Sequence, residues 1–416
     1  MIVDLFAGPG GLDVAAHWLG VPSIGIEFDE SAVATREAAG FSTIFDDVSS
    51  WQPTDFTSAM NVLTGGPPCQ TYTVAGNGHG RQALARVLQL VQNLGDGQID
   101  CVADEIAAHS DPRTGLVLQP LIWALRAVEA DRPYQAIMLE QVPEVRPVWE
   151  ATARVLEARG YGVDVDVLCT EEYGVPQTRR RAVLIARYGI TSDGVQLPAA
   201  THQKYVGKAA EVDASNEFGC SLPRWVSMAE ALDISGPFVV VSNYGSGGDS
   251  KNRGKRRHDR PAFTVTGKAS RNKIVMGGGD ESRRFGSREA GRLQTFPDGY
   301  PWSGRDVSQQ IGNAIPPRLG THVLRSLLGI DIELNDAFFA ERRMNWKGPD
   351  RATLNSVRDA VAREDVVVES RTTITAKPER VASSRGGEVL GVVRGSPTLD
   401  AVEPREGHRT RTSVAV

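Results

Sequence analysis

Residues 1–190 alternate between short apolar segments and longer amphipathic segments, and this alternation constrains the fold more than any other feature of the chain. It predicts strands at Ile2–Phe6, Ser23–Glu27, Val62–Thr64, Ala136–Glu140, Val163–Leu168 and Ala182–Ala186. It predicts helices at Leu12–Leu19, Ser31–Ala39, Leu116–Ala130 and Pro147–Ala158. Strands separated by helices of this length imply an α/β fold with a doubly wound, mostly parallel sheet. Such sheets bind ligands beyond the carboxyl ends of their strands.

The rest of the chain divides into two regions of different composition. Residues 191–307 are rich in glycine and basic residues, and they predict a small, irregular second domain with β-like pieces at Phe238–Val241, Phe263–Thr266 and Lys273–Met276. A helix at Leu319–Leu328 is expected to return to the first domain, which we therefore assign to residues 1–190 and 308–330. Residues 331–416 form a polar tail, and we expect disorder after about residue 365.

The composition of the 416 residues is that of an ordinary globular protein, with 41% hydrophobic and 23% charged residues. No apolar run approaches the roughly 20 residues of a membrane-spanning helix. The first predicted strand begins at residue 2 and leaves no room for a signal peptide. The four cysteines form no CxxC pair, which argues against a disulfide framework and a zinc cluster. We therefore expect a cytoplasmic protein with no membrane association and no metal.

A glycine turn follows the first predicted strand and precedes the first predicted helix. The segment Phe6–Gly11 lets the backbone approach a ligand closely, and the N-terminus of the helix favours anionic groups. Glu27 ends the next strand, where an acid can bind both ribose hydroxyls of a nucleotide-like cofactor. Phe6 or Phe28 is then available to face an adenine ring, and Asp47 to bind its amino group. The competing interpretation makes Phe6 a core residue and Glu27 a surface acid.

Cys69 lies in a Pro-Pro-Cys-Gln turn directly after a strand, where a thiol is held on stiff backbone. A free thiol has a pKa near ~8.5, so it needs positive surroundings to act as a nucleophile. Arg179 and Arg181 are spaced to share one strand face, and they are the candidates for that role. Glu140 ends an apolar strand and is a candidate general acid. Alternatively, Arg179 and Arg181 belong to an exposed basic edge strand, and Glu140 caps a helix.

The charge of the chain is unevenly distributed. Its net charge is −5, yet residues 251–273 contain nine Lys or Arg residues and a single acid, Asp259. A basic stretch in an acidic protein is typical of a contact with a phosphate backbone. A solvated charged loop would have the same composition, and the sequence does not decide between the two.

In combination, these motifs resemble the S-adenosylmethionine-dependent cytosine-C5 DNA methyltransferases. The resemblance covers about residues 1–190 and 255–330, and its strength lies in the order of the motifs. The matching segments are Phe6–Gly11, Glu27, Asp47, Pro68-Cys69-Gln70, Glu140-Gln141-Val142, Gln177–Arg181, Arg288–Asp298 and Gln310–Pro317.

The resemblance implies a Rossmann-like methyltransferase fold and a covalent mechanism. Cys69 would add to C6 of a cytosine that has been flipped out of the duplex, and Glu140 would act at N3. Arg181, Arg179 and Gln141 would complete the catalytic group. S-adenosyl-L-methionine would be the cofactor, with contacts from Phe6, Ala7, Gly8, Gly10, Gly11, Glu27, Phe28, Asp47, Val48, Pro68, Leu116, Asn313 and Ala314. Residues 191–307 would be the target-recognition domain, and DNA contacts are expected from Gln70, Thr73, Lys251, Arg253, Lys255, Arg256 and Arg257.

Three departures from the family pattern stand out. Gln141 replaces the usual Asn, which braces the Pro-Cys turn, so we expect bracing that is looser or indirect. Thr73 stands where a serine hydroxyl is usual. Arg113, which resembles the family's next arginine, lies 44 positions after Cys69, and the interval includes apolar residues at helical spacing, Leu84, Val87, Leu88 and Val91. We expect this inserted helix to change how DNA is clamped.

Other functions remain open at this level. A tRNA cytosine-C5 methyltransferase shares these motifs, and a catalytically impaired regulator would fit the change at Gln141. A nicotinamide oxidoreductase shares only the glycine turn. The preferred interpretation is a monomeric DNA methyltransferase acting on double-stranded DNA in a bacterial nucleoid or a phage-infected cell, with a cognate restriction endonuclease or as an orphan enzyme.

Overall fold

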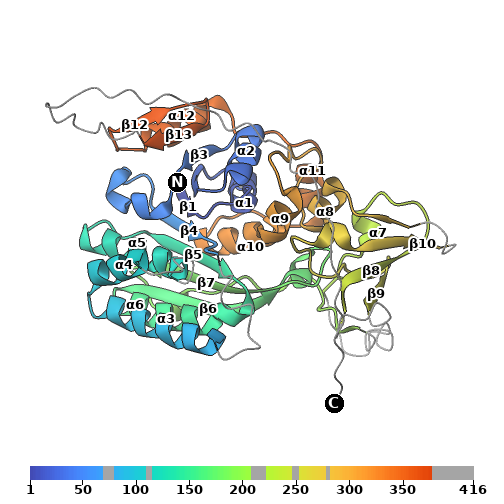
Figure 1. Ribbon diagram of the computed structural model, residues 1–416, viewed down its shortest axis with the longest axis horizontal. Helices are drawn as coiled ribbons and strands as arrows, with labels where there is room; N and C mark the ends of the chain where they lie inside the picture. Colours follow the sequence, from blue (N-terminus) through green and yellow to red (C-terminus); the bar gives the residue numbers. More distant parts are fainter. Residues whose placement is uncertain (69–78, 109–114, 208–221, 246–252, 278–281, 377–416) are drawn as a thin grey trace, which may run out of the picture. The chain divides into compact units, whose positions relative to one another are not determined.

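A computed structural model describes residues 1–68, 79–108, 115–207, 222–245, 253–277 and 282–376, without the side chains of residues 79–82, 244 and 245. These residues belong to one compact unit, Met1–Lys377. Its main sheet has the strand order β12-β13-β3-β2-β1-β4-β5-β7-β6 (Figure 1). The bounds of these strands are β1 Ile2–Leu5, β2 Ser23–Glu27, β3 Ser42–Phe45, β4 Val62–Gly65, β5 Ala136–Gln141, β6 Tyr161–Cys169, β7 Arg180–Tyr188, β12 Val366–Val368 and β13 Thr373–Ala376.

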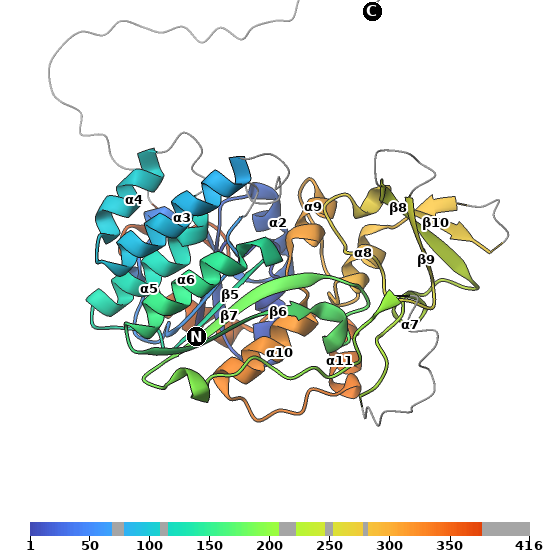
Figure 2. The same ribbon diagram turned by 90° about the horizontal axis from the view of Figure 1, so that it is seen from below.

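Helices cover both faces of this sheet. The helices are α1 Gly11–Trp18, α2 Glu30–Ala39, α3 His79–Gly95, α4 Ile99–Ala108, α5 Gln119–Glu129, α6 Arg146–Glu157, α7 Met228–Ala231, α8 Ser287–Leu293, α9 Val307–Asn313, α10 Pro317–Leu328, α11 Asp336–Arg343 and α12 Arg351–Asp359. Figure 2 shows α3, α4, α5 and α6 together on one face, with α10 on the other. The predicted α/β fold and its predicted strands in residues 1–190 are confirmed.

Side chains that alternate along each strand explain why both faces are covered. Ile137 and Leu139 of β5 join the core beneath α3, α5 and α6. Met138, the residue between them, joins a second core formed with α1 and α10. Because both faces of β5 are apolar, the strand is stable only between two helical layers.

The order of the strands creates a switch point between β1 and β4. β1 pairs in parallel with β2 on one side and with β4 on the other. The chain therefore winds away from β1 in opposite directions in the two halves of the sheet. Ligands of doubly wound sheets bind at such a point, outside the carboxyl ends of the strands. Those ends are Leu5 and Gly65, which the glycine turn and the Gly66–Pro68 segment follow.

β7 is antiparallel to its neighbours β5 and β6. Its register pairs Ala182 with Gln141 and Val183 with Glu140, so the beginning of β7 lies beside the carboxyl end of β5. This reversal brings Arg181 to the edge of the sheet where the other strands end. The sequence pattern did not predict it.

A second, antiparallel sheet lies within residues 191–307, with the order β11-β10-β8-β9. Its strands are β8 Phe238–Gly245, β9 Arg253–Arg257, β10 Lys273–Met276 and β11 Ser282–Arg284. The pieces predicted at Phe238–Val241 and Lys273–Met276 are confirmed, whereas Phe263–Thr266 forms no strand. Side chains of Phe238, Val240 and Ile274 pack with Leu293 of α8 in a separate core.

The prediction for the C-terminal tail is wrong for residues 366–376. β13 pairs in parallel with β3, and β12 pairs with β13, so both strands extend the main sheet. Ile374 is buried in the main core because β3 offers an unpaired sheet edge and an apolar surface. Residues 377–416 lie outside the described part of the chain.

The helix predicted after Cys69 is confirmed as α3, and it is a core element. Val87, Val91 and Leu94 are almost completely buried and pack in the same core as Trp149 of α6. Gly95 ends the helix as predicted. Deletion of this helix would therefore expose the core, so it cannot test the expected effect on DNA clamping, which stays a prediction.

His322 of α10 is buried between two aromatic rings. The centroid of its ring lies 5.5 Å from that of Tyr173 and 5.3 Å from that of Phe339. Its Nε2 has no hydrogen-bond partner in the described chain, and the side chain is 4% exposed. Burial, assisted by the positive charge of Arg318, lowers the pKa of His322 to about 3.

We predict that His322 makes the protein less stable in acid. The unfolded chain takes up a proton on this histidine below about pH 6.5, whereas the folded chain does so only near pH 3. The contribution of His322 to the free energy of unfolding is therefore fully present above pH 6.5, and it falls by up to about 1.4 kcal/mol per pH unit below that pH. The free energy of unfolding, measured in urea at pH 7.5, 6 and 5, should fall less steeply for His322→Phe. Parallel pH profiles for the two proteins would contradict the prediction.

Candidate active site

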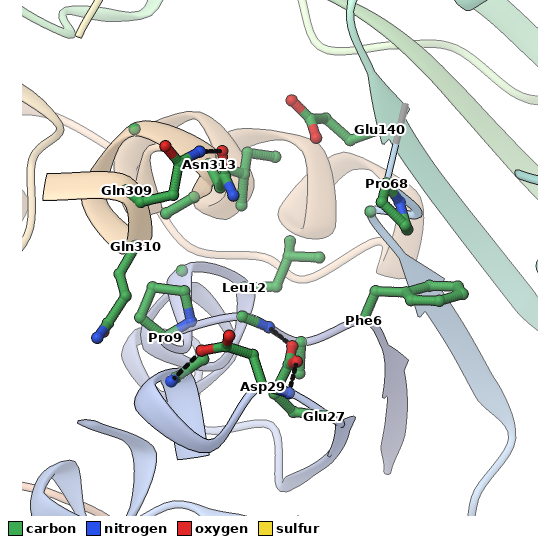
Figure 3. Close-up of a pocket in the computed structure, with 18 of the residues that line it drawn as sticks. Phe6, Pro9, Leu12, Glu27, Asp29, Pro68, Glu140, Gln309, Gln310 and Asn313 are labelled. Atoms are coloured by element: carbon green, nitrogen blue, oxygen red, sulfur yellow. Dashed lines mark hydrogen bonds between the residues drawn. The ribbon is translucent and has the colours of Figure 1, made fainter. Parts of the chain in front are cut away.

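A cavity of about 520 Å³ opens at the switch point, beyond the carboxyl ends of β1 and β4 (Figure 3). In this view Glu140 and Glu27 lie on different sides of the cavity, with Phe6 between them. The lining combines the glycine turn, the end of β2, the segment after β4, the end of β5 and residues between Arg305 and Ile315. Segments far apart in sequence thus meet in one concave site.

The glycine turn after β1 has an unusual backbone. Phe6 has a φ of 58°, a conformation that residues with a side chain rarely adopt. Gly10 has a φ of 98° and precedes α1, whose N-terminus faces this region. Strained backbone persists only where the surroundings determine it. Here it is held partly by the bond from Gly8 N to Glu27 Oε2, 2.7 Å long.

Glu27 joins the glycine turn to the start of α2. Its Oε1 accepts hydrogen bonds from the backbone N–H groups of Phe28 and Asp29, at 2.8 and 2.7 Å. Burial raises the pKa of Glu27, and these hydrogen bonds partly oppose that shift. A carboxylate offers about four lone-pair positions. Three are occupied by backbone donors, so Glu27 can still accept a bond from a ligand hydroxyl.

Glu140 and Arg181 form an ion pair at the other side of the cavity. Arg181 Nε lies 2.6 Å from Glu140 Oε1, and both side chains are largely buried. Burial lowers the pKa of Arg181, and the carboxylate of Glu140 opposes this effect. The antiparallel register of β5 and β7 explains the pair, because it sets both residues at one sheet edge. A buried, paired carboxylate of this kind has a defined orientation.

Gln141 braces the segment that leads to Cys69. Its Nε2 donates a 2.5 Å hydrogen bond to the carbonyl oxygen of Pro67, and its Oε1 accepts one from Val142 N. The expectation of looser or indirect bracing is wrong as far as Pro67 is concerned, because the longer side chain reaches the carbonyl directly. Cys69 itself, with Gln70 and Thr73, lies outside the described residues.

Arg179 does not line this cavity, contrary to prediction. It precedes β7, is 1% exposed, and donates to the carbonyl oxygens of Val265, Gly312 and Ala314 at 2.9 to 3.1 Å. Burial holds the pKa of Arg179 well below its usual value. Its role in this structure is to hold the Gly312–Ala314 segment, which lines the cavity.

Two buried glutamines complete this polar cluster. Gln177 donates to Leu293 O and to Gln294 Oε1, and its own Oε1 accepts from Val265 N. Gln294 in turn donates to Ile311 O and Ala314 O. Both side chains are fully buried, so each of these bonds replaces one that water would make. We call Arg179, Gln177 and Gln294 the polar cluster.

The structure divides the remaining predicted site residues into two groups. Those that line the cavity are Phe6, Ala7, Gly8, Gly11, Glu27, Pro68, Glu140, Gln141, Arg181, Asn313 and Ala314. Those that do not are Gly10, Phe28, Asp47, Val48 and Leu116. Asp47 instead caps a short helix through Ser49, Val48 is a core residue, and Phe28 is 72% exposed.

Several lining residues were not predicted as site residues. Asp29 and Gln310 belong to motifs in which only a neighbour was singled out. Gln310 binds the hydroxyl of Thr35 and the carbonyl of Ser31, and so fixes α9 against α2. Asp4 lies in β1, accepts a 2.6 Å bond from Thr64, and has a pKa raised to about 8 by burial and by Asp13. Asp4 was not predicted as a site residue, because it lies among apolar residues in the middle of a predicted strand.

The basic stretch that the sequence shows at residues 251–273 is divided by strand alternation in β9. In β9, Lys255 and Arg257 are exposed, and Arg257 pairs with Asp259. Arg256 points to the opposite side, where it donates to the Thr178 hydroxyl and stacks on Phe263 at 4.2 Å. The prediction of Arg256 as a DNA contact therefore conflicts with its structural role. Lys251 lies outside the described residues.

Two further features concern the described residues alone. None of their helices combines the length and the apolar character needed to cross a membrane. None of their His, Cys, Asp and Glu side chains gather in threes or more to hold a metal ion.

Comparison with known proteins identifies the family. The chain matches the family described as C-5 cytosine-specific DNA methylase over residues 1–90 and 110–329. Similar proteins include the type II methyltransferase M.PspPI of Psychrobacter sp., 26% identical, with 79% of this chain and 78% of that protein covered. They also include M.Sau96I of Staphylococcus aureus, 26% identical, with 79% and 75% covered.

Solved structures agree on the fold. S. pombe Dnmt2 methyltransferase superimposes with a TM-score of 0.52 at 16% identity, covering 79% of this chain and 98% of that one. Entamoeba histolytica methyltransferase EhMeth gives a TM-score of 0.50 at 14% identity, covering 80% and 98%. At these identities the likeness concerns the fold alone.

We predict that Gln141→Leu lowers the free energy of unfolding by about 1–3 kcal/mol, because it leaves the Pro67 carbonyl without its donor. The free energy of unfolding of Gln141→Asn should lie between those of the wild type and Gln141→Leu, since the shorter amide cannot reach as far. Gln135→Leu is the control, because it makes the same change at an exposed position just before β5. Urea unfolding of all four proteins tests this, and equal stability of Gln141→Leu and wild type would show that the bond contributes nothing.

Proposed function

This chain belongs to the family of C-5 cytosine-specific DNA methylases, and we propose that it methylates C5 of cytosine in double-stranded DNA at the cavity beyond β1 and β4. One observation carries the proposal. The Glu140–Arg181 pair, the glycine turn and Pro68, the residue before Cys69, line the same cavity. The proposal therefore places the nucleophile Cys69, an acid and a cofactor site within reach of one substrate.

S-adenosyl-L-methionine is the methyl donor that we propose, and the residues of the cavity fit it. The volume of about 520 Å³ is that of a typical cofactor site. Backbone N–H groups at the glycine turn suit the amino-acid carboxylate, and Glu27 retains capacity for a ribose hydroxyl. When bound, this cofactor supplies an electrophilic methyl group. The residues that would hold it are Phe6, Gly8, Gly11, Glu27, Asn313 and Ala314.

Cys69 is the proposed nucleophile. Its sulfur would form a bond to C6 of the cytosine, which breaks the aromaticity of the ring and makes C5 nucleophilic. After C5 has been methylated, a base removes the proton from C5 and the bond from sulfur to C6 breaks. Gln141 would serve this step by fixing Pro67, two residues before Cys69.

Glu140 is the proposed group at N3 of the cytosine. For this step Glu140 must carry a proton on the oxygen that Arg181 does not bind, because an ionised carboxylate accepts hydrogen bonds and donates none. Donation of this proton or of a hydrogen bond to N3 then prevents negative charge from accumulating on the ring during the attack. Arg181 holds the carboxylate through the 2.6 Å ion pair. Because both side chains are buried, little water competes for Glu140 when the base is bound.

The second domain, residues 191–307, is the proposed target-recognition region. Lys255 and Arg257 present positive charge on the exposed side of β9, and Arg253 shares their strand alternation. Because the cytosine of a duplex is stacked, the enzyme would flip it into the cavity. The relatives named type II methyltransferases favour a role beside a restriction endonuclease, which we include in the proposal.

A trapping experiment tests the catalytic assignment. Duplex DNA containing 5-fluorocytosine should give a covalent adduct with the wild-type protein in the presence of S-adenosyl-L-methionine, because the fluorine blocks release of the cysteine. Cys69→Ser should form no adduct, and Cys101→Ser, which changes an exposed cysteine of α4, should form it normally. Glu140→Ala should lose about 10²–10⁴-fold in turnover. Adduct formation by Cys69→Ser, or transfer to tRNA but not to duplex DNA, would refute the proposal.

A matched pair in β9 tests the DNA surface. Lys255→Ala should weaken binding to duplex DNA and reduce the slope of log affinity against log salt by about 1, with unchanged stability. Arg256→Ala should lower the melting temperature instead, since it removes the donor to the Pro261 carbonyl and one of the donors to the Ala262 carbonyl. DNA-binding titrations at several salt concentrations and thermal melts would separate the two effects. Normal DNA binding by Lys255→Ala would remove β9 from the interface.

A further inference from the structure

The chain continues past the residues matched to the family, and residues 330–376 return to the cofactor half of the sheet. We call these residues the C-terminal segment. Figure 1 shows its last elements, α12, β12 and β13, beside β3. β13 pairs with β3, and Trp346 Nε1 donates a 3.1 Å hydrogen bond to Ala39 O at the end of α2. The segment is thus anchored on the same α2 and β3 that follow Glu27.

Trp346 joins an aromatic cluster between this segment and the rest of the protein. Its ring centroid lies 5.4 Å from that of Phe41 and 5.4 Å from that of Tyr300. It also contacts the His17 ring of α1, at 5.3 Å. Phe41 and Tyr300 are buried, whereas Trp346 is only partly buried and covers them from outside.

Phe41 and Tyr300 lie directly behind the glycine turn. A Cβ atom added to Gly10 would be 2.7 Å from Phe41 Cε2 and 3.0 Å from the Tyr300 hydroxyl, so these rings are already in close contact with the turn. The Tyr300 hydroxyl donates a hydrogen bond to the carbonyl oxygen of Pro9. Pro9 itself lines the cavity. The rings of Phe41 and Tyr300 therefore pack against one side of the glycine turn, and the other side of the turn lines the proposed cofactor site.

We propose that Trp346 is a positioning residue for S-adenosyl-L-methionine, acting through Phe41 and Tyr300 on the backbone of the glycine turn. This inference rests on the proposed function, because it assumes that this cavity binds the cofactor. The turn contains the left-handed residues Phe6 and Gly10, and such a backbone keeps its conformation only while its surroundings hold it. Without Trp346, Phe41 and Tyr300 gain room to move away from the turn, and small displacements of a binding backbone cost affinity.

Backbone hydrogen bonds also connect the C-terminal segment to the loop that carries Tyr300. The backbone N–H of Trp346 donates to Asp298 O, and Asp298 N donates to Arg343 O, so the loop that carries Tyr300 is paired with this segment. The segment thereby connects the loop before α9 with α2. Both α2 and α9 contribute residues to the cavity lining, Ala32 and Gln310 among them.

Equilibrium binding of S-adenosyl-L-methionine to the full chain, measured by calorimetry without DNA, tests the inference. Trp346→Ala should bind about tenfold more weakly, which is about 1.4 kcal/mol, whereas Trp346→Phe should stay within about threefold of wild type because it keeps a ring against Phe41. Tyr300→Phe, which removes only the hydroxyl that binds Pro9, should also weaken binding. In turnover, Trp346→Ala should raise KM for the cofactor with a change in kcat of less than about twofold.

Leu354→Ala is the control for general destabilisation, because Leu354 is a buried residue of α12 in the same segment. It should lower the melting temperature and leave cofactor affinity unchanged. Wild-type affinity in both Trp346→Ala and Tyr300→Phe, or an equal loss of affinity in Leu354→Ala, would overturn the inference. Absence of binding by the wild-type protein would instead refute the proposed cofactor site, and this inference with it.

Discussion

The structure depends on a buried arginine whose two terminal nitrogens donate to backbone carbonyls from distant parts of the chain. Arg179 precedes β7, yet its guanidinium group binds the carbonyl oxygens of Val265, between β9 and β10, and of Gly312 and Ala314, before α10. A buried charge without partners is very unfavourable, so the fold is stable only when these carbonyls are in place. The rigid, planar fork of arginine suits this role better than the single ammonium of lysine. Gln177 and Gln294 extend the same constraint to α8 and α9.

The polar cluster explains how one cavity can be assembled from both ends of the chain. The glycine turn and Glu27 come from the first strands, whereas Asn313 and Ala314 follow the antiparallel sheet of β8 to β11 in the sequence. Since α10 packs on α1 through Leu319 and Leu12, the apolar core holds this return but does not define its register. Directional hydrogen bonds to Gly312 and Ala314 do. The antiparallel β7 plays a similar part for Arg181, because the register of β5 and β7 places it beside Glu140.

In two places, basic residues that are close together in sequence have different surroundings, and strand geometry explains both cases. Lys255 and Arg256 are neighbours in sequence, yet strand alternation exposes one and directs the other onto Phe263. Arg179 and Arg181 are two residues apart, yet only Arg181 reaches the cavity, because Arg179 precedes the regular strand. Residue type predicted positive charge correctly in each case. Residue type did not predict which of these side chains form hydrogen bonds within the protein, as Arg179 and Arg256 do.

The sequence by itself determined the α/β alternation, the positions of nearly all strands and helices in residues 1–190, and the motifs that identify the family. These are local properties, since periodicity and turn residues act within a few positions. Only the tertiary structure decided the antiparallel reversal of β7, the role of Arg256, the reach of Gln141 to Pro67 and the return of residues 366–376 to β3. The physical reason is that each of these depends on a partner far along the chain, such as the exposed edge of β3 or the Pro67 carbonyl. A local sequence pattern carries no information about such distant partners, because they come together only in the folded sheet.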